Sequence, residues 1–173
     1  MGAVLMFVMI LSREVFAAEK SRPMGEMHRS CLDFKLNLSQ EFKIWKERPL
    51  KAHSAEEFLT QKRTQLSLVK QEQIRFLKTP EKLFPVKGES YGGVFYFQVP
   101  KSGKFRISAG SKVWSDVVEV DTNKIIEAAE FEMQTGCDRI FKTVIFDLTA
   151  KTKYALQVNS SVKPAVDFLI TAE

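Results

Sequence analysis

Soft metal ligands gather near the start of the chain. Met24 and Met27 supply thioethers, His28 an imidazole and Cys31 a thiol, all within eight residues. These are the side chains that hold copper(I) in proteins, so one hypothesis is a periplasmic protein that handles copper. The alternative, which we favour, is a leader with incidental methionines and a Cys31 that is committed to a disulfide. The two hypotheses compete at Cys31, because a sulfur in a disulfide cannot bind metal as a thiolate.

A second candidate site is a tryptophan followed by a carboxylate. Trp114 and Asp116 are two residues apart in a segment that predicts a strand, so their side chains share one face. An exposed indole beside a carboxylate can stack on a sugar ring and bind its hydroxyls. The alternative, which we favour, is a core tryptophan with Asp116 paired to Arg139 or Lys142, because a carboxylate in an apolar strand needs a donor. These four residues are the predicted ligand-binding residues.

The net charge of +5 is distributed unevenly along the chain. Residues 18–90 contain 15 Lys and Arg against 10 Asp and Glu, whereas residues 91–173 contain 10 of each sign. A basic first half could face an anionic surface such as lipid head groups or acidic polysaccharide. Acidic residues are interleaved with the basic ones, however, so a solvated face of mixed charge is our preferred interpretation.

Sequence signals for catalysis are sparse. The chain has two histidines, His28 and His53, which are too few for a three-histidine metal site. Neither a nucleophile elbow, nor a His-Glu-x-x-His string, nor a P-loop occurs. A hydrolase with an unrecognised carboxylate site is a third hypothesis, although nothing in the sequence selects the carboxylates. We therefore predict no catalytic residues and no cofactor.

The first residues predict export from the cytoplasm. Residues 2–11 form a run of ten apolar residues, about half the ~20 that a helix needs to cross a bilayer. Val15 and Ala17 are tolerated at the two positions that a signal peptidase reads, which predicts cleavage before Ala18. The product is expected to be periplasmic or secreted, not membrane-spanning, and without a nucleic-acid partner. The predicted organisation is a signal peptide at 1–17, a flexible leader at 18–30 and a single domain at 31–173.

Export determines how the two cysteines are interpreted. Thiols tend to pair in an oxidising compartment, and Cys31 and Cys137 are the two cysteines of the chain. A bridge between them would close a loop of about 107 residues and contribute roughly 4 to 5 kcal/mol to stability. We therefore predict a disulfide that joins the start of the domain to its last third.

The elements that must position these residues are mainly strands. A short helix capped by Ser54 is expected at 55–58, and residues 39–45 could be a helix or a continuing strand. Recurrent short strands without a long helix predict an antiparallel β-sandwich or jelly-roll-like fold, with one or two short helices in the N-terminal half. Apolar residues that alternate with polar ones, or short apolar runs, predict strands at 32–38, 65–69, 73–76, 94–99, 104–108, 112–120, 125–133, 137–148, 154–158 and 166–170.

Four sequence strings occur in an order that resembles a known group of proteins. They are YGGVFYFQVPKSGKFRIS, KVWSDVVEV, CDRIFKTVIFDL and TKYALQV. This succession resembles small exported bacterial β-sandwich proteins of unknown function. The last part is also similar, more loosely, to the bacterial pre-peptidase C-terminal domains, which are β-sandwich accessories of secreted enzymes.

The function that these features favour is binding. We expect a non-catalytic binding or accessory protein of the bacterial cell envelope. Its partner would be a glycan, another envelope component or a protein.

Overall fold

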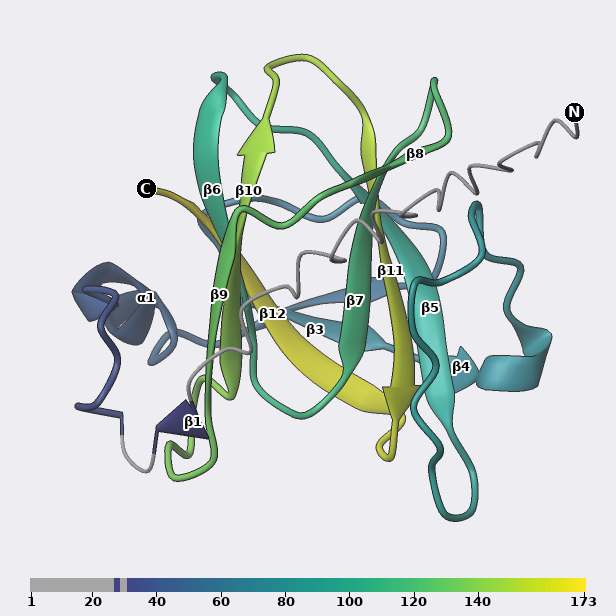
Figure 1. Cartoon of the computed structure of the whole chain (residues 1–173), viewed down its shortest axis with the longest axis horizontal. Helices are drawn as coiled ribbons and strands as arrows, with labels where there is room; N and C mark the ends of the chain where they lie inside the picture. Colours follow the sequence, from purple (N-terminus) through teal and green to yellow (C-terminus); the bar gives the residue numbers. More distant parts are fainter. Residues whose placement is uncertain (1–26, 29–30) are drawn as a thin grey trace, which may run out of the picture.

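The chain forms two β-sheets packed face to face (Figure 1). The computed structural model describes residues 27–28 and 31–173, so the predicted signal peptide and nearly all of the leader lie outside the described residues. The elements are β1 (Met27–His28), α1 (Ser39–Ile44), β2 (Leu50–His53), β3 (Thr64–Ser67), β4 (Val69–Lys70), the 3-10 helix η1 (Gln71–Gln73), β5 (Tyr91–Phe97), β6 (Gly103–Ala109), β7 (Trp114–Glu119), β8 (Lys124–Ile126), β9 (Glu130–Gln134), β10 (Lys142–Leu148), β11 (Tyr154–Ser161) and β12 (Ala165–Ala172).

The two sheets have different sizes and mainly antiparallel pairing. Seven strands form one sheet in the order β1-β9-β10-β6-β12-β3-β2, and five form the other in the order β4-β5-β11-β7-β8. The exceptions are β1 with β9 and β2 with β3, which run parallel. The predicted mainly-β sandwich is therefore confirmed.

The core lies between the sheets and follows from the period of two in each strand. Phe95 and Phe97 of β5 point inward from the smaller sheet, and Phe105, Phe146 and Phe168 point inward from the larger one. All five are at most 3% exposed. Each fully buried aromatic or aliphatic side chain contributes about 1.5 to 3 kcal/mol, so this layer provides most of the driving force for folding.

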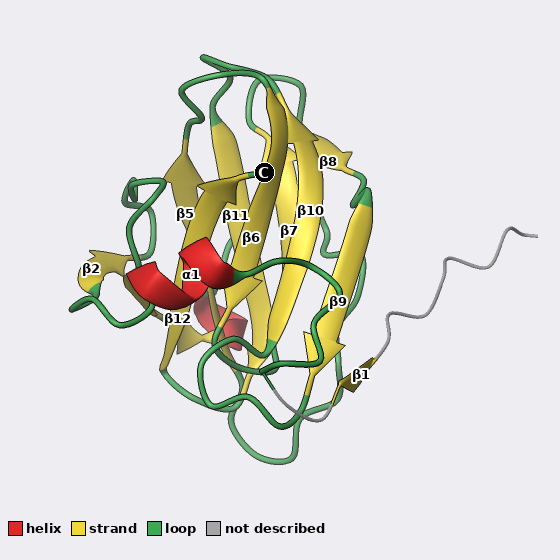
Figure 2. Ribbon diagram, turned by 90° about the vertical axis from the view of Figure 1, so that its left-hand side faces the viewer, coloured by secondary structure: helices red, strands yellow, loops and turns green. Residues whose placement is uncertain are grey.

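The larger sheet is covered on its outer face by α1 (Figure 2). The sequence did not decide whether residues 39–45 form a helix or a strand. In the structure, Ser39–Ile44 form the helix α1. Leu38 and Trp45 flank α1. They pack on Leu169 of β12 and on Ile140, which lies just before β10. Their spacing places them on one side of a helix of 3.6 residues per turn.

The smaller sheet is covered by the loop between η1 and β5. Ile74, Phe76 and Leu77 of this loop pack on the outward-facing Val118 and Ala155. The strand predicted at 73–76 is therefore wrong, because these apolar residues cover a sheet instead of joining one.

Two other predicted elements are also wrong. Residues 32–38 contain no strand; the N–H of Leu36 donates to a Glu132 side-chain oxygen at 3.2 Å instead of to a neighbouring strand. Residues 55–58 are not helical, because their backbone groups bond to β5. The N–H of Phe58, for example, donates to the carbonyl of Tyr96 at 2.9 Å. The hydroxyl of Ser54 accepts from the N–H of Val94 at 3.2 Å and so does not cap a helix.

Candidate functional site

Trp114 and Asp116 share one face of β7, as their spacing predicts. The indole Nε1–H of Trp114 donates to Oδ1 of Asp116 at 2.7 Å. The other oxygen, Oδ2, accepts from the backbone N–H of Glu81 at 3.2 Å, and Glu81 belongs to the loop that covers this sheet. Asp116 is 3% exposed. Its carboxylate is thus buried and bonded to two uncharged donors.

This part of β7 is the edge of the smaller sheet. β8 pairs with Val117, Val118 and Glu119, whereas Trp114 to Asp116 pair, within the described chain, with β11 alone. The first residue of β10 in the facing sheet, Lys142, reaches the indole here. Its Nζ is 5.5 Å from the Trp114 ring centroid. Because β8 does not extend along Trp114, Lys142 of the larger sheet can contact this tryptophan at the edge of the smaller sheet.

Two residues of the covering loop complete this group. Nζ of Lys82 is 5.0 Å from the Trp114 ring centroid, and the ring of Phe84 meets the indole edge-on at 5.6 Å. We call Lys82, Phe84, Trp114, Asp116 and Lys142 the loop-end site. Trp114 is half-buried, so it is neither the core tryptophan that we favoured nor an open platform for a sugar ring.

Burial shifts the pKa values of both charged groups inside this site. Lys142 is 6% exposed, and loss of hydration lowers its pKa to about 8, against the weaker attraction of Asp116. Burial likewise raises the pKa of Asp116, and the hydrogen bonds from Trp114 and Glu81 oppose that rise. Lys142 attracts Asp116 through its charge. The hydrogen bonds that Asp116 accepts within the described chain come instead from uncharged donors, the Trp114 indole and the Glu81 backbone.

Arg139, the fourth predicted ligand-binding residue, contacts other partners. Its guanidinium lies over the Phe42 ring at 5.8 Å, and its Nε is 3.5 Å from Oδ1 of Asp138. Of the two partners predicted for Asp116, Lys142 interacts with it electrostatically, whereas Arg139 contacts Phe42 and Asp138.

The predicted disulfide between Cys31 and Cys137 is present. These two residues and Asp138 bring metal-ligating atoms together in the described part of the chain. Because the sulfurs of Cys31 and Cys137 are bonded to each other, the two cysteines offer no thiolate to a metal. Of the other proposed copper ligands, Met24 lies outside the described residues, as do the side chains of Met27 and His28. The copper hypothesis thus loses Cys31 as a ligand.

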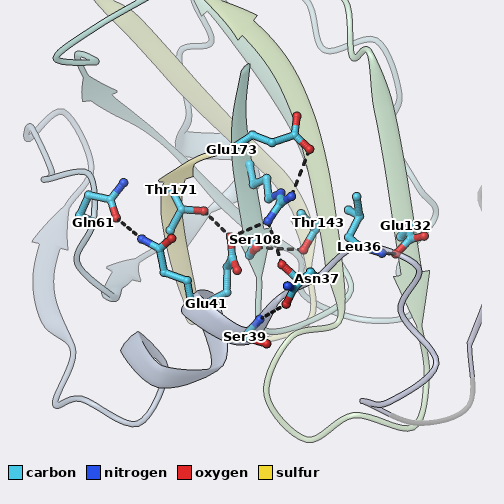
Figure 3. A network of polar contacts seen from close by, with 12 residues as sticks. Leu36, Asn37, Ser39, Glu41, Gln61, Ser108, Glu132, Thr143, Thr171 and Glu173 are labelled. Carbon is cyan, nitrogen blue, oxygen red and sulfur yellow. Dashed lines mark hydrogen bonds and ion pairs between the residues drawn. The ribbon is translucent and has the colours of Figure 1, made fainter. Parts of the chain in front are cut away.

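A further buried charged group is the side chain of Glu41, which α1 places between itself and the larger sheet (Figure 3). Glu41 is fully buried, and its Oε1 accepts from the Thr171 hydroxyl at 2.6 Å and from Nη1 of Arg106 at 3.4 Å. Nη2 of Arg106 contacts Oε1 of Glu173 at 3.1 Å. We call Glu41, Arg106, Thr171 and Glu173 the helix clamp, because they join α1 to β6 and to the C-terminal strand.

An open depression of about 540 Å³ adjoins the helix clamp. Arg106 lines it, but this guanidinium is already paired with Glu41 and Glu173. The guanidinium of Arg106 is therefore not available to an anionic ligand, and the unpaired cation that the described residues offer at this depression is the exposed Lys43. Its lining residues are Asn37, Ser39, Gln40, Lys43, Arg106, Ala172 and Glu173.

Reasoning from the sequence did not identify the helix clamp. A signal was present, because Glu41 lies on the same helical face as Leu38, Phe42 and Trp45. An acidic residue in an apolar stripe requires a buried partner. The sequence could not say that this partner is Arg106, which is 65 residues away.

Comparisons with protein-family models, with curated proteins and with solved structures find no match to this chain. None of the helices in the described residues is long and apolar enough to cross a membrane.

Proposed function

We propose that this chain is an exported, non-catalytic binding or accessory protein of the cell envelope, and that it binds an anionic envelope component at the loop-end site. The observation that carries the proposal is the half-buried Trp114 ring, which has the ammonium groups of Lys82 and Lys142 at 5.0 and 5.5 Å from its centroid. Cations held beside an aromatic face attract anionic groups while the ring supplies apolar contact.

The environment of Asp116 favours an anionic ligand over a neutral sugar. Both carboxylate oxygens already accept hydrogen bonds, from Trp114 and from Glu81, and the side chain is buried. A sugar hydroxyl would have to replace one of these donors. Lys82, in contrast, is exposed, so a carboxylate or phosphate can reach it without rearrangement.

Two observations support the location in the envelope. Residues 2–11 have the length and apolar character of the central region of a signal peptide. The bridge between Cys31 and Cys137 is of a kind that persists in oxidising compartments.

The proposal is tested by charge reversal at the exposed lysine of the site. The purified exported protein is labelled and its equilibrium binding to isolated bacterial envelopes is measured at low and at physiological salt. Lys82→Glu should weaken binding about tenfold, because it replaces an attraction beside Trp114 by a repulsion.

Lys101→Glu is the matched control. Lys101 is also exposed, but it follows β5 at the opposite end of the sandwich, so envelope binding should be unchanged. Absence of binding by the wild-type protein, or equal losses in the two variants, would overturn the proposal.

A further inference from the structure

Exposed apolar side chains gather at the end of the sandwich that carries the loop-end site. Leu83 is 57% exposed, Phe84 39% and Val162 65%. Leu83 and Phe84 belong to the loop before β5, and Val162 belongs to the turn between β11 and β12. Large apolar side chains in such positions mark surfaces that contact a partner or a membrane.

Hydrogen bonds and strand register place these loops together. The N–H of Phe84 donates to the Ser160 hydroxyl at 2.9 Å, and Tyr91 is the register partner of Ser161. Both ends of the segment 84–91 therefore lie beside the β11–β12 turn. Trp114 is the partner of Asn159, so the β6–β7 connection reaches the same end, the lower one in Figure 1.

Four exposed lysines lie in the loops at this same end. Lys82 and Lys87 lie in the loop before β5, Lys112 precedes β7 and Lys163 lies in the β11–β12 turn. Within the described residues, the ion pairs of the molecule involve other lysines and arginines. Glu89 of the same loop pairs with Lys70 instead. The end therefore combines projecting apolar groups with a local excess of positive charge.

We propose that this end docks on the surface of a bilayer that contains anionic phospholipid, an inference that rests on the proposed function and names its ligand. The apolar side chains stand on loops and project outward, whereas the depression found in the described chain lies beside α1. Projecting apolar groups on the same loops as exposed lysines match an interface in which acyl chains lie just beneath anionic head groups. A soluble glycan would gain little from Leu83 and Val162.

The surface draws on both halves of the chain. Lys82 and Lys87 come from the basic first half, and Lys112 and Lys163 come from the half whose charges balance. The folded structure therefore creates a basic patch that the distribution of charge along the sequence did not indicate.

Co-sedimentation with vesicles tests the proposal. The exported protein is mixed with vesicles of phosphatidylcholine and phosphatidylglycerol, in a ratio of about three to one, or of phosphatidylcholine alone. It should bind the anionic vesicles and not the neutral ones. The double variant Lys87→Glu/Lys163→Glu should reduce the partition coefficient about tenfold or more, and Leu83→Ser/Val162→Ser about fivefold.

Matched substitutions elsewhere separate docking from general effects. Leu59→Ser changes a leucine of similar exposure, 63%, and Lys101→Glu reverses a lysine at the opposite end; both variants should bind like the wild type. Circular dichroism verifies that each variant is folded.

The outcomes distinguish this inference from the proposed function. Binding to isolated envelopes without binding to anionic vesicles would overturn bilayer docking and leave the proposed function standing, with an acidic glycan or a protein as its ligand. Failure to bind either would overturn both. Equal losses in test and control variants would overturn docking through this end.

Discussion

Two of the buried carboxylates, those of Glu41 and Asp116, are stabilised in different ways. Glu41 of the helix clamp meets a cation directly, since Arg106 is within 3.4 Å and the Thr171 hydroxyl adds a hydrogen bond. Asp116 of the loop-end site accepts from an indole and from a backbone N–H, while Lys142 acts on it from farther away. Glu41 is thus stabilised by a neighbouring cation, whereas Asp116 is stabilised by hydrogen bonds from uncharged donors.

This difference separates the structural role of the helix clamp from the binding role that we propose for the loop-end site. In the helix clamp, Arg106 faces both Glu41 and Glu173, so its positive charge is used within the fold. In the loop-end site, the hydrogen bonds of Asp116 leave Lys82 and Lys142 beside the indole without a direct partner in the described chain. Residual positive charge near the surface is what an anionic ligand requires.

The largest effect is expected from breaking the helix clamp. Arg106→Met would leave Glu41 buried without its cation, and we expect a loss of about 3 to 5 kcal/mol in the free energy of unfolding. Chemical denaturation measures this loss. Lys104→Met is the control on the same strand, because Lys104 and Asp147 form an exposed ion pair whose loss should cost less than about 1 kcal/mol. Equal losses would show that Arg106 is not a buried partner of Glu41.

A smaller, pH-dependent effect is expected from Lys142. Its pKa is about 8 in the folded protein and 10.5 in the reference state. Between pH 8 and 10.5, Lys142 carries a proton in the unfolded chain but has largely lost it in the folded protein, so the free energy of unfolding rises with pH over this range. Relative to Lys142→Met, the wild-type protein should gain roughly 3 kcal/mol between the two pH values. Denaturation across this range measures the gain; the same comparison with Lys101→Met should show none, and a flat difference for Lys142 would contradict its burial.

The smallest effect on stability is expected from Asp116→Asn. The amide retains an acceptor for the Trp114 N–H and removes a buried charge, but its NH2 group would face the N–H of Glu81, so the free energy of unfolding should fall by about 1 to 2 kcal/mol. The pKa of Lys142 should nevertheless fall below about 8, because the attraction of Asp116 is lost. NMR titration of the lysine side chains measures this shift. An unchanged pKa would show that the two groups do not interact.

Much of the second half of the fold could be predicted from local pattern. The strands predicted at 94–99, 104–108 and 154–158 correspond to β5, β6 and β11, because their residues show either a period of two or a short apolar run that is buried on both faces. The prediction at 125–133 combined two strands, β8 and β9, which belong to different sheets. The crossing at residues 127–129 is short and contains neither glycine nor proline, so no turn signal in the sequence marks it.

The first half was harder to predict because its segments mostly cover sheets. Phe34 and Leu36 pack around α1, and Ile74 and Phe76 pack on the smaller sheet. Alternating apolar residues predict contact with a core, but they do not specify whether the backbone bonds to a neighbouring strand. The predicted Ser54 helix failed for a related reason, since β5 offers hydrogen-bond partners that local sequence cannot reveal.

The sequence alone determined the sandwich class, the disulfide between Cys31 and Cys137, and the common face of Trp114 and Asp116, because these depend on periodicity or on the small number of cysteines. Only the tertiary structure decided that Lys82, Lys142 and Phe84 surround the indole, and that Glu41 is paired with Arg106. These contacts join separate loops and strands, and their positions follow from how two sheets and their covering segments pack together.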